Sequence, residues 1–85
     1  MSMDKTNALL RRAENVLASG TNTESKSFKR FVKGVSPLFI THGQGAHVYD
    51  VEGNKYVDTI GSLGANLLGH AHPAVNQAIQ EQLSR

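Results

Sequence analysis

Residues 61–73, with the sequence GSLGANLLGHAHP, constrain this chain more than any other stretch. They contain three glycines and two histidines but no charged residue, and they separate a strand-like segment from a helix-like one. Glycine adopts backbone dihedrals that other residues avoid and lets neighbouring atoms approach closely. Leu67 and Leu68 give the stretch an apolar surface to bury. The pattern predicts a packed loop between a strand and a helix, which is either a binding loop or a tight crossover without a ligand.

Two segments have the periodicity of amphipathic helices. Residues 4–19 form the first, with Asp4 placed as its N-cap and Gly20 as its C-terminal stop. Its apolar positions recur at helical spacing and are Leu9, Leu10, Ala13, Val16 and Leu17. Residues 73–84 form the second, where Pro73 suits the first turn because that position needs no N–H donor. Its apolar stripe is Val75, Ala78, Ile79 and Leu83.

Three short strands are expected between these helices, at residues 37–41, 46–50 and 55–60. Gly43 and Gly45 break the first strand. Residues 51–54, with the sequence VEGN, join the second strand to the third and carry a good hairpin signal. The sequence therefore predicts a three-stranded antiparallel meander. In its last strand, the side chains of Tyr56, Asp58 and Ile60 are expected on one face of the sheet, and those of Val57 and Thr59 on the other.

Composition limits the classes that such a chain can join. Its 85 residues suit one small domain at most, and the formal charge is +2. The chain has no cysteine, which excludes a disulfide framework and cysteine-bound zinc. No stretch is long enough to span a bilayer, and the first residues lack a secretion pattern, so we expect a cytoplasmic protein without a membrane partner.

A short basic run occupies residues 26–33, where Phe28 and Phe31 are interleaved with the basic side chains Lys26, Lys29, Arg30 and Lys33. Such a run is either a patch for phosphate or carboxylate groups or a solvated loop. A nucleic-acid-binding module usually carries a broader basic face, so we expect no nucleic-acid partner.

The motifs of residues 50–72 leave the chemistry open. His70 and His72 have a spacing that could chelate a metal, but no third ligand is evident, so we expect no metal and predict that both rings bond backbone groups. The glycines of the loop do not match the spacing of dinucleotide or P-loop motifs. From the residues alone, the chain is a mixed α/β piece with a packed glycine loop.

Two longer stretches carry a resemblance to a known family. They are GAHVYDVEGNKYVD at residues 45–58 and LGHAHPAV at residues 68–75, followed by Ala78. In order and spacing they resemble the N-terminal region of the class III aminotransferases. The resemblance implies an α/β enzyme of fold type I with pyridoxal 5'-phosphate as cofactor. It also implies a homodimer that acts on a small-molecule amino donor and a carbonyl substrate.

Within this family the chain is most similar to the glutamate-1-semialdehyde 2,1-aminomutases and their aminotransferase relatives. The resemblance places Ser62 and Leu63 beside the substrate, with Leu63 where the aminomutases have a tryptophan. Thr23 and Lys26 stand where that branch has a serine and an arginine that face the substrate carboxylate. The family's Schiff-base lysine and cofactor-binding residues would all lie downstream, so we expect no catalytic or cofactor-binding residue in this chain.

These expectations define the predicted organisation. Residues 1–60 form the helix and meander of a small domain, and residues 61–85 form the glycine loop and the first helix leading into a large domain. The chain is then an N-terminal fragment of a pyridoxal-phosphate-dependent transaminase or aminomutase, and it is inactive alone. The alternative is a non-catalytic anion-binding module that uses the basic run at residues 26–33.

Overall fold

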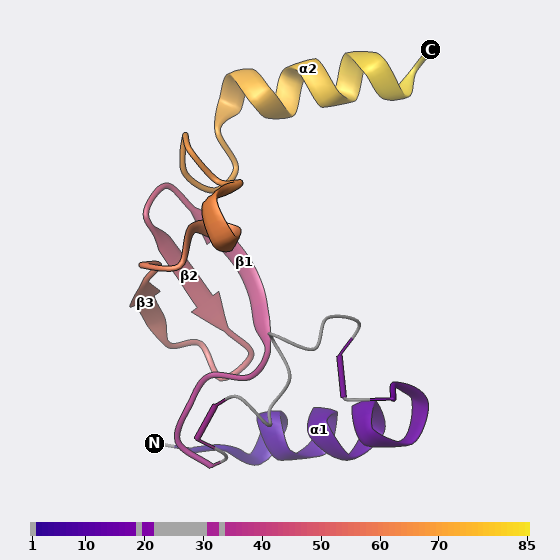
Figure 1. Ribbon diagram of the computed structural model, residues 1–85, viewed down its shortest axis with the longest axis vertical. Helices are drawn as coiled ribbons and strands as arrows, with labels where there is room; N and C mark the ends of the chain where they lie inside the picture. Colours follow the sequence, from indigo (N-terminus) through magenta and orange to yellow (C-terminus); the bar gives the residue numbers. More distant parts are fainter. Residues whose placement is uncertain (1, 19, 22–30, 33) are drawn as a thin grey trace. The chain divides into compact units, whose positions relative to one another are not determined.

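The computed structural model describes residues 2–18, 20–21, 31–32 and 34–85. Its elements, in chain order, are α1 (Asp4–Val16), β1 (Ile40–Gln44), β2 (His47–Asp50), β3 (Lys55–Val57), the short 3-10 helix η3 (Gly61–Gly64) and α2 (Pro73–Leu83) (Figure 1). The chain divides into two compact units. The α1 unit takes in Met1–Ile40 and Asp50–Asn54, and the sheet unit takes in Thr41–Tyr49 and Lys55–Arg85.

In the α1 unit, the helix begins with a cap that comes from a distant part of the chain. Met3 is the N-cap residue and makes no side-chain cap bond, so the prediction of Asp4 as N-cap is wrong. Asp4 is instead the first helical residue. The free N–H of Thr6 donates to Glu52 Oε1 at 2.6 Å. A carboxylate suits this position because it satisfies an orphan donor and lies at the positive end of the helix dipole.

The far end of α1 departs from the predicted length. The helix ends at Val16, before the expected residue 19, because Leu17 adopts an extended conformation. Gly20 has a φ of +71° and donates its N–H to the carbonyl oxygen of Leu17, so it lies in the turn after the helix. The buried apolar residues of the described chain are Leu10 and Ala13, both on α1, whereas Val16 is exposed. Among its described residues, the apolar core of this unit is therefore small.

The three strands form one antiparallel sheet in the order β1-β2-β3, which confirms the predicted meander. β2 pairs with β3 in the register His47↔Val57, Val48↔Tyr56 and Tyr49↔Lys55. On β1, the ring of His42 stacks on Tyr49 of β2 with 4.4 Å between ring centroids.

The hairpin between β2 and β3 is built around the buried carboxylate of Asp50. Asp50 Oδ1 accepts the N–H groups of Glu52 at 3.0 Å and Asn54 at 2.8 Å, and Oδ2 accepts the side-chain amide of Asn54 at 3.1 Å. Gly53 adopts a φ of +88°, which favours glycine. The predicted hairpin at residues 51–54 is confirmed.

All three predicted strands have different limits in the structure, although β2 differs only in beginning one residue later, at His47. β1 begins at Ile40 instead of residue 37 and continues through Gly43, which was expected to break it. The limits of a strand depend on backbone hydrogen bonds to a neighbouring strand. In the apolar run before Ile40, the carbonyl oxygen of Phe39 accepts a hydrogen bond from the N–H of Val51. β3 ends at Val57 instead of residue 60, because the next residue, Asp58, turns the chain.

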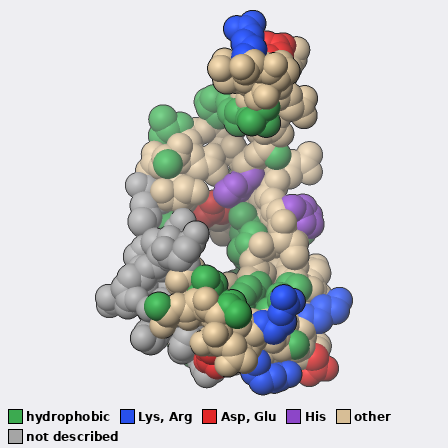
Figure 2. Space-filling model, turned by 90° about the vertical axis from the view of Figure 1, so that its right-hand side faces the viewer, with side chains coloured by type: hydrophobic (Ala, Val, Ile, Leu, Met, Phe, Trp, Pro, Cys, Tyr) green, Lys and Arg blue, Asp and Glu red, His purple; other side chains and the backbone are tan. Residues whose placement is uncertain are grey.

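α2 agrees with the predicted helix at residues 73–84 to within one residue, and Pro73 lies in its first turn. No residue of α2 is buried. Its apolar stripe is uncovered, with Val75 at 40%, Ile79 at 52% and Leu83 at 80% exposure. Figure 2 shows a group of hydrophobic side chains at the surface, just below the charged side chains at the top of the view. Among the described residues, no helix combines the length and the apolarity needed to cross a membrane. The domain boundary at residues 60 and 61 stays a prediction.

Candidate functional site

The predicted glycine loop begins as η3, a 3-10 turn that follows β3. Ser62 lies in this turn with a φ of +55° and an exposed side chain. Leu63 is the next residue of the same turn. The structure thus places Ser62 and Leu63 together, whereas Thr23 and Lys26 lie outside the described residues. The four basic side chains of the predicted anion patch also lie outside them.

Asp58 is the residue that starts the turn. Its Oδ1 accepts the N–H groups of Ile60 at 2.8 Å and Gly61 at 3.1 Å. Such a bond from an aspartate to backbone amides two and three residues ahead makes a local turn in place of a continued strand. The backbone then closes on itself, because the N–H of Asn66 donates to the carbonyl oxygen of Gly61 at 3.0 Å.

The second oxygen of Asp58 binds His70, which lies twelve residues further along the chain. His70 Nε2–H donates to Asp58 Oδ2 at 2.7 Å, and Asn66 Nδ2–H donates to His70 Nδ1 at 3.2 Å. We call these three residues the clamp. The hydrogen bond from His70, followed by those from the amides of Gly61 and Ile60, lowers the pKa of Asp58 below its ordinary value of 3.8. The prediction that the His70 ring bonds backbone groups is wrong, because both of its nitrogens bond side chains.

Three glycines let the clamp reach the sheet. A Cβ on Gly43 would lie 2.7–2.8 Å from ring and Cβ atoms of His70, so the histidine packs directly on the β1 backbone. The backbones of Gly45 and His70 form an isolated antiparallel bridge, with N···O distances of 2.9 and 2.8 Å. A Cβ on Gly69 would lie 3.0 Å from the Gly45 backbone. The attachment of the loop therefore includes two close approaches, at Gly43 and Gly69, where a side chain would clash.

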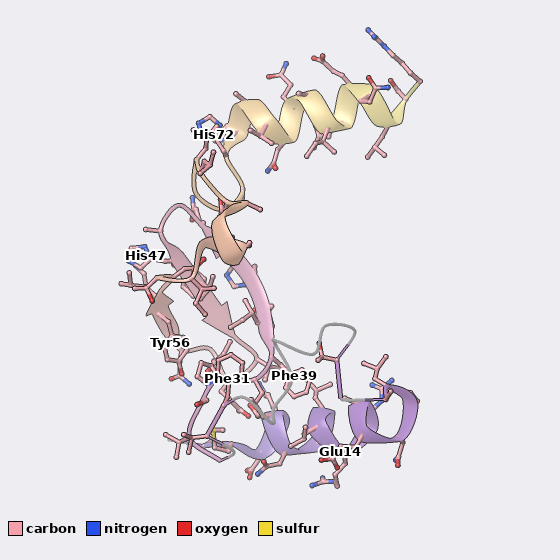
Figure 3. All side chains as sticks on the ribbon, viewed as in Figure 1. Glu14, Phe31, Phe39, His47, Tyr56 and His72 are labelled. Atoms are coloured by element: carbon pink, nitrogen blue, oxygen red, sulfur yellow. The ribbon has the colours of Figure 1, made fainter. Side chains whose placement is uncertain are left out.

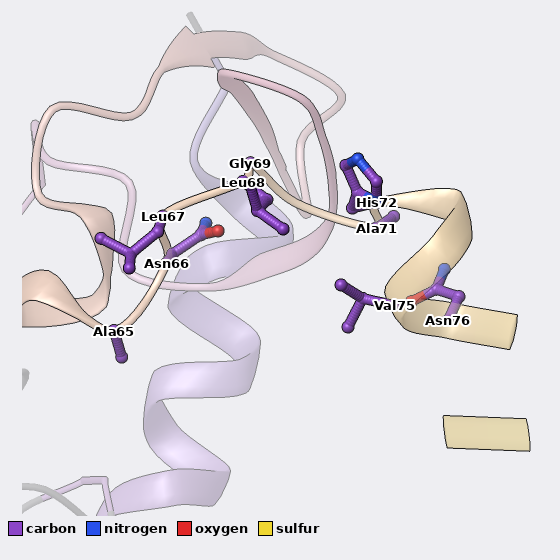
Figure 4. Close-up of a pocket in the computed structure, with 9 residues that line it drawn as sticks. All are labelled: Ala65, Asn66, Leu67, Leu68, Gly69, Ala71, His72, Val75 and Asn76. Atoms are coloured by element: carbon purple, nitrogen blue, oxygen red, sulfur yellow. The ribbon is translucent and has the colours of Figure 1, made fainter. Parts of the chain in front are cut away.

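Beyond the clamp, the chain lines a pocket of about 460 Å³ at the start of α2 (Figure 4). Its lining is mainly apolar and consists of Ala65, Asn66, Leu67, Leu68, Gly69, Ala71, His72, Val75 and Asn76. His72 lies just before α2 (Figure 3), and its Nδ1 is buried without a hydrogen-bond partner. Within the part of the chain that the structure describes, no three metal-ligating side chains come together.

Sequence reasoning missed the link between Asp58 and His70 and the cap that Glu52 provides. Two signals were present for the first. Asp58 lies three residues before a glycine, which favours a turn over a continued strand. His70 lies in an otherwise uncharged loop, where a packed ring needs partners for its nitrogens.

Comparisons with known proteins agree on one family. The family model described as "Aminotransferase class-III" matches residues 30–85. A glutamate-1-semialdehyde 2,1-aminomutase of Heliobacterium modesticaldum is 40% identical over 82 residues, which are 96% of this chain and 18% of that protein. One of Chloroflexus aggregans is 48% identical over 73 residues, which are 86% of this chain and 16% of that protein.

Solved structures give the same result. A structure described as a transaminase with PLP bound matches with a TM-score of 0.82 and 28% identity, and covers 99% of this chain and 19% of its own. An omega-transaminase from Sphaerobacter thermophilus matches with a TM-score of 0.77 and 28% identity, and covers 92% of this chain and 17% of its own. This confirms the expected α/β fold of the transaminases. The chain spans less than a fifth of the length of these relatives. Because the family model matches more than half of its residues, the chain belongs to the class III aminotransferase family.

Proposed function

We propose that this chain is the N-terminal part of an enzyme that moves an amino group with pyridoxal 5'-phosphate. The reaction is either that of a transaminase, which passes the group to a second molecule, or that of an aminomutase, which moves it within one molecule. The observation that carries the proposal is the match to a PLP-bound transaminase over 99% of the chain. The relatives in sequence are aminomutases and those in structure are transaminases, so both reactions remain within the proposal.

The residues that the structure describes do not by themselves fit the cofactor. The described lysines, Lys5 and Lys55, are both exposed, and neither lines the pocket beside α2. A phosphate needs cationic side chains or converging backbone N–H groups, and the Schiff base needs an amine. We therefore assign these roles to the rest of the enzyme. When bound, the cofactor supplies an electron sink, and the contribution of this chain is to bind and orient the substrate.

Within this proposal, Ser62 and Leu63 border the substrate, and Thr23 and Lys26 face its carboxylate. The left-handed conformation of Ser62 supports the first part, since such strained residues cluster at functional sites. A lysine at residue 26 keeps the positive charge of an arginine but cannot make its bidentate contact with a carboxylate. Leu63 provides no aromatic wall, so we expect the preferred substrate to differ from glutamate-1-semialdehyde.

The test is a set of steady-state rates for the full-length, cofactor-loaded protein with a panel of amino donors and carbonyl acceptors. We expect amino transfer with several donors and poor turnover of glutamate-1-semialdehyde. Leu63→Trp should raise the relative turnover of that substrate. Leu83→Trp is the matched control, because Leu83 is 80% exposed at the end of α2, does not line the pocket and should leave substrate preference unchanged. Efficient aminomutase activity with Leu63 in place would contradict the expected preference, and the absence of amino transfer with every donor would refute the function.

The proposed enzyme is a cytoplasmic homodimer whose partners are small-molecule substrates, with no nucleic acid or membrane among them. Light scattering of the full-length protein tests the dimer, and a monomer at all concentrations would contradict it. The competing anion-binding module gains no support here, because its basic side chains lie outside the described residues.

A further inference from the structure

We propose that Asp58 and His70 are positioning residues, which together with Asn66 hold the η3 turn so that Ser62 is presented to the substrate in a fixed conformation. The substrate part of this inference rests on the proposed function. The positioning part rests on contacts within the sheet unit alone.

The clamp uses both oxygens of one carboxylate for different purposes. Asp58 Oδ1 accepts the N–H groups of Ile60 and Gly61, which directly precede Ser62. Asp58 Oδ2 accepts the proton of His70 Nε2. Because a hydrogen bond at each oxygen fixes the carboxylate against rotation, His70 determines the direction from which Asp58 holds the turn. The Asp58 side chain is 14% exposed, and its bonds to Gly61 and His70 are partly buried.

His70 is itself fixed from three directions. Its Nδ1 accepts a bond from Asn66, its ring packs on the bare backbone of Gly43, and its main chain is bridged to Gly45. A ring held at both nitrogens keeps one tautomer, with the proton on Nε2 for Asp58. The position of η3 is therefore fixed relative to strand β1, through Asp58 and His70, and does not depend only on the loop that follows η3.

Backbone strain identifies the two places where this fixation acts. In the described part of the chain, the non-glycine residues with positive φ are Ser62, at +55°, and Ala71, at +52°. Ser62 follows the amide of Gly61 that Asp58 holds, and Ala71 follows His70 directly. Left-handed residues of this kind persist only where their surroundings over-determine them. The clamp constrains the residue that precedes each of them, which is Gly61 before Ser62 and His70 before Ala71.

The experiment uses the full-length, cofactor-loaded enzyme and three variants of it. His70→Phe keeps a ring over Gly43 but removes both nitrogens. His70→Gln keeps an N–H donor within reach of Asp58 and is the conservative rescue. Thr59→Ala is the matched control, since Thr59 is exposed next to Asp58 and makes none of the clamp bonds. Two quantities are measured: hydrogen exchange of a peptide covering residues 60–66, and the separate KM and kcat values for the amino substrate.

For His70→Phe we expect faster exchange in residues 60–66 and a KM raised roughly tenfold, since a bond to a charged group contributes that much or more. Its kcat should stay within about twofold, because a loosened binding surface weakens ground state and transition state alike. His70→Gln should recover most of both effects, and Thr59→Ala should match the wild type. Asp58→Asn serves as a second variant if His70→Phe does not fold, and it should also raise KM.

Three results would overturn the inference. Unchanged exchange in residues 60–66 would show that the clamp does not hold the turn. Faster exchange with an unchanged KM would show that it holds the turn without positioning the substrate. If the wild-type enzyme transfers no amino group, the proposed function and the substrate part of the inference are both refuted. The wild-type assay alone distinguishes this result from the other two.

Discussion

The close approach of Gly69 to Gly45 leads to the most direct quantitative prediction. Gly69 has a φ of +84°, and an added Cβ would lie 3.0 Å from the Cα and carbonyl oxygen of Gly45. Gly45 has a φ of +58°, and a Cβ added there would meet nothing within 4 Å. Both residues belong to the contact that fastens the loop to β1. Gly69→Ala therefore adds backbone strain and a steric clash, whereas Gly45→Ala adds strain alone.

The expected difference follows from these two terms. A left-handed alanine costs about 1–2 kcal/mol, and replacing glycine offsets about 0.4–1 kcal/mol of that through the unfolded state. Both variants share this balance. Overpacking against backbone that cannot move aside adds about 1–3 kcal/mol for Gly69→Ala only. We expect Gly69→Ala to reduce the free energy of local opening by about 1–3 kcal/mol more than Gly45→Ala.

The assay is native-state hydrogen exchange of the full-length protein, read at the amides of residues 45 and 70, which donate across the bridge. These amides report local opening directly. Gly69→Ala should speed their exchange roughly fivefold to a hundredfold relative to Gly45→Ala, as 1.4 kcal/mol corresponds to tenfold. Equal exchange in the two variants would refute the argument, because the close approach would then contribute nothing to the loop's attachment.

Three further predictions concern other parts of the chain. Glu52→Ala should destabilise the first turn of α1 by about 1 kcal/mol, because it removes the acceptor for the Thr6 N–H, and Glu52→Gln should destabilise it less. The measurement is hydrogen exchange of that turn, and unchanged exchange in both variants would contradict the role of Glu52. The folded pKa of Asp58 lies below 3.8, so its stabilising effect is complete above pH 3.8 and is lost as the pH falls through the folded value. Protection of the Ile60 amide should follow this acid transition, and the transition should vanish in Asp58→Asn. The 85-residue chain alone should show no cooperative thermal transition by circular dichroism, because α2 buries no residue. It should also lack the visible absorbance of lysine-bound cofactor, because the described lysines, Lys5 and Lys55, are exposed and do not line the pocket.

Local signals were enough to predict the hairpin and α2. In the hairpin, Asp50, Gly53 and Asn54 act on one another within five residues, through carboxylate-to-amide bonds and a left-handed glycine. In α2, Pro73 fixes the first turn by itself. Interactions of such short range can be inferred from spacing, and here the predicted and observed elements agree.

Long-range partners explain what the sequence did not predict. Glu52 caps Thr6 across 46 positions, and His70 bonds Asp58 across 12, and neither separation follows from a periodic pattern. The limits of β1 also depend on a partner outside the strand, because they follow from pairing with β2 and not from the glycine within β1, Gly43. Two of the predicted site residues, Ser62 and Leu63, follow from the family resemblance, and their roles stay predictions.

Two of the residues that carry the family resemblance contact main-chain atoms directly. Asp58 bonds the main-chain amides of Ile60 and Gly61, and Gly69 contacts the main chain of Gly45. None of these contacts depends on the side chain at residue 62 or 63. A clamp of this kind can hold the same turn while the side chains that it presents differ. Relatives described as aminomutases and relatives described as transaminases can therefore share the fold of this segment.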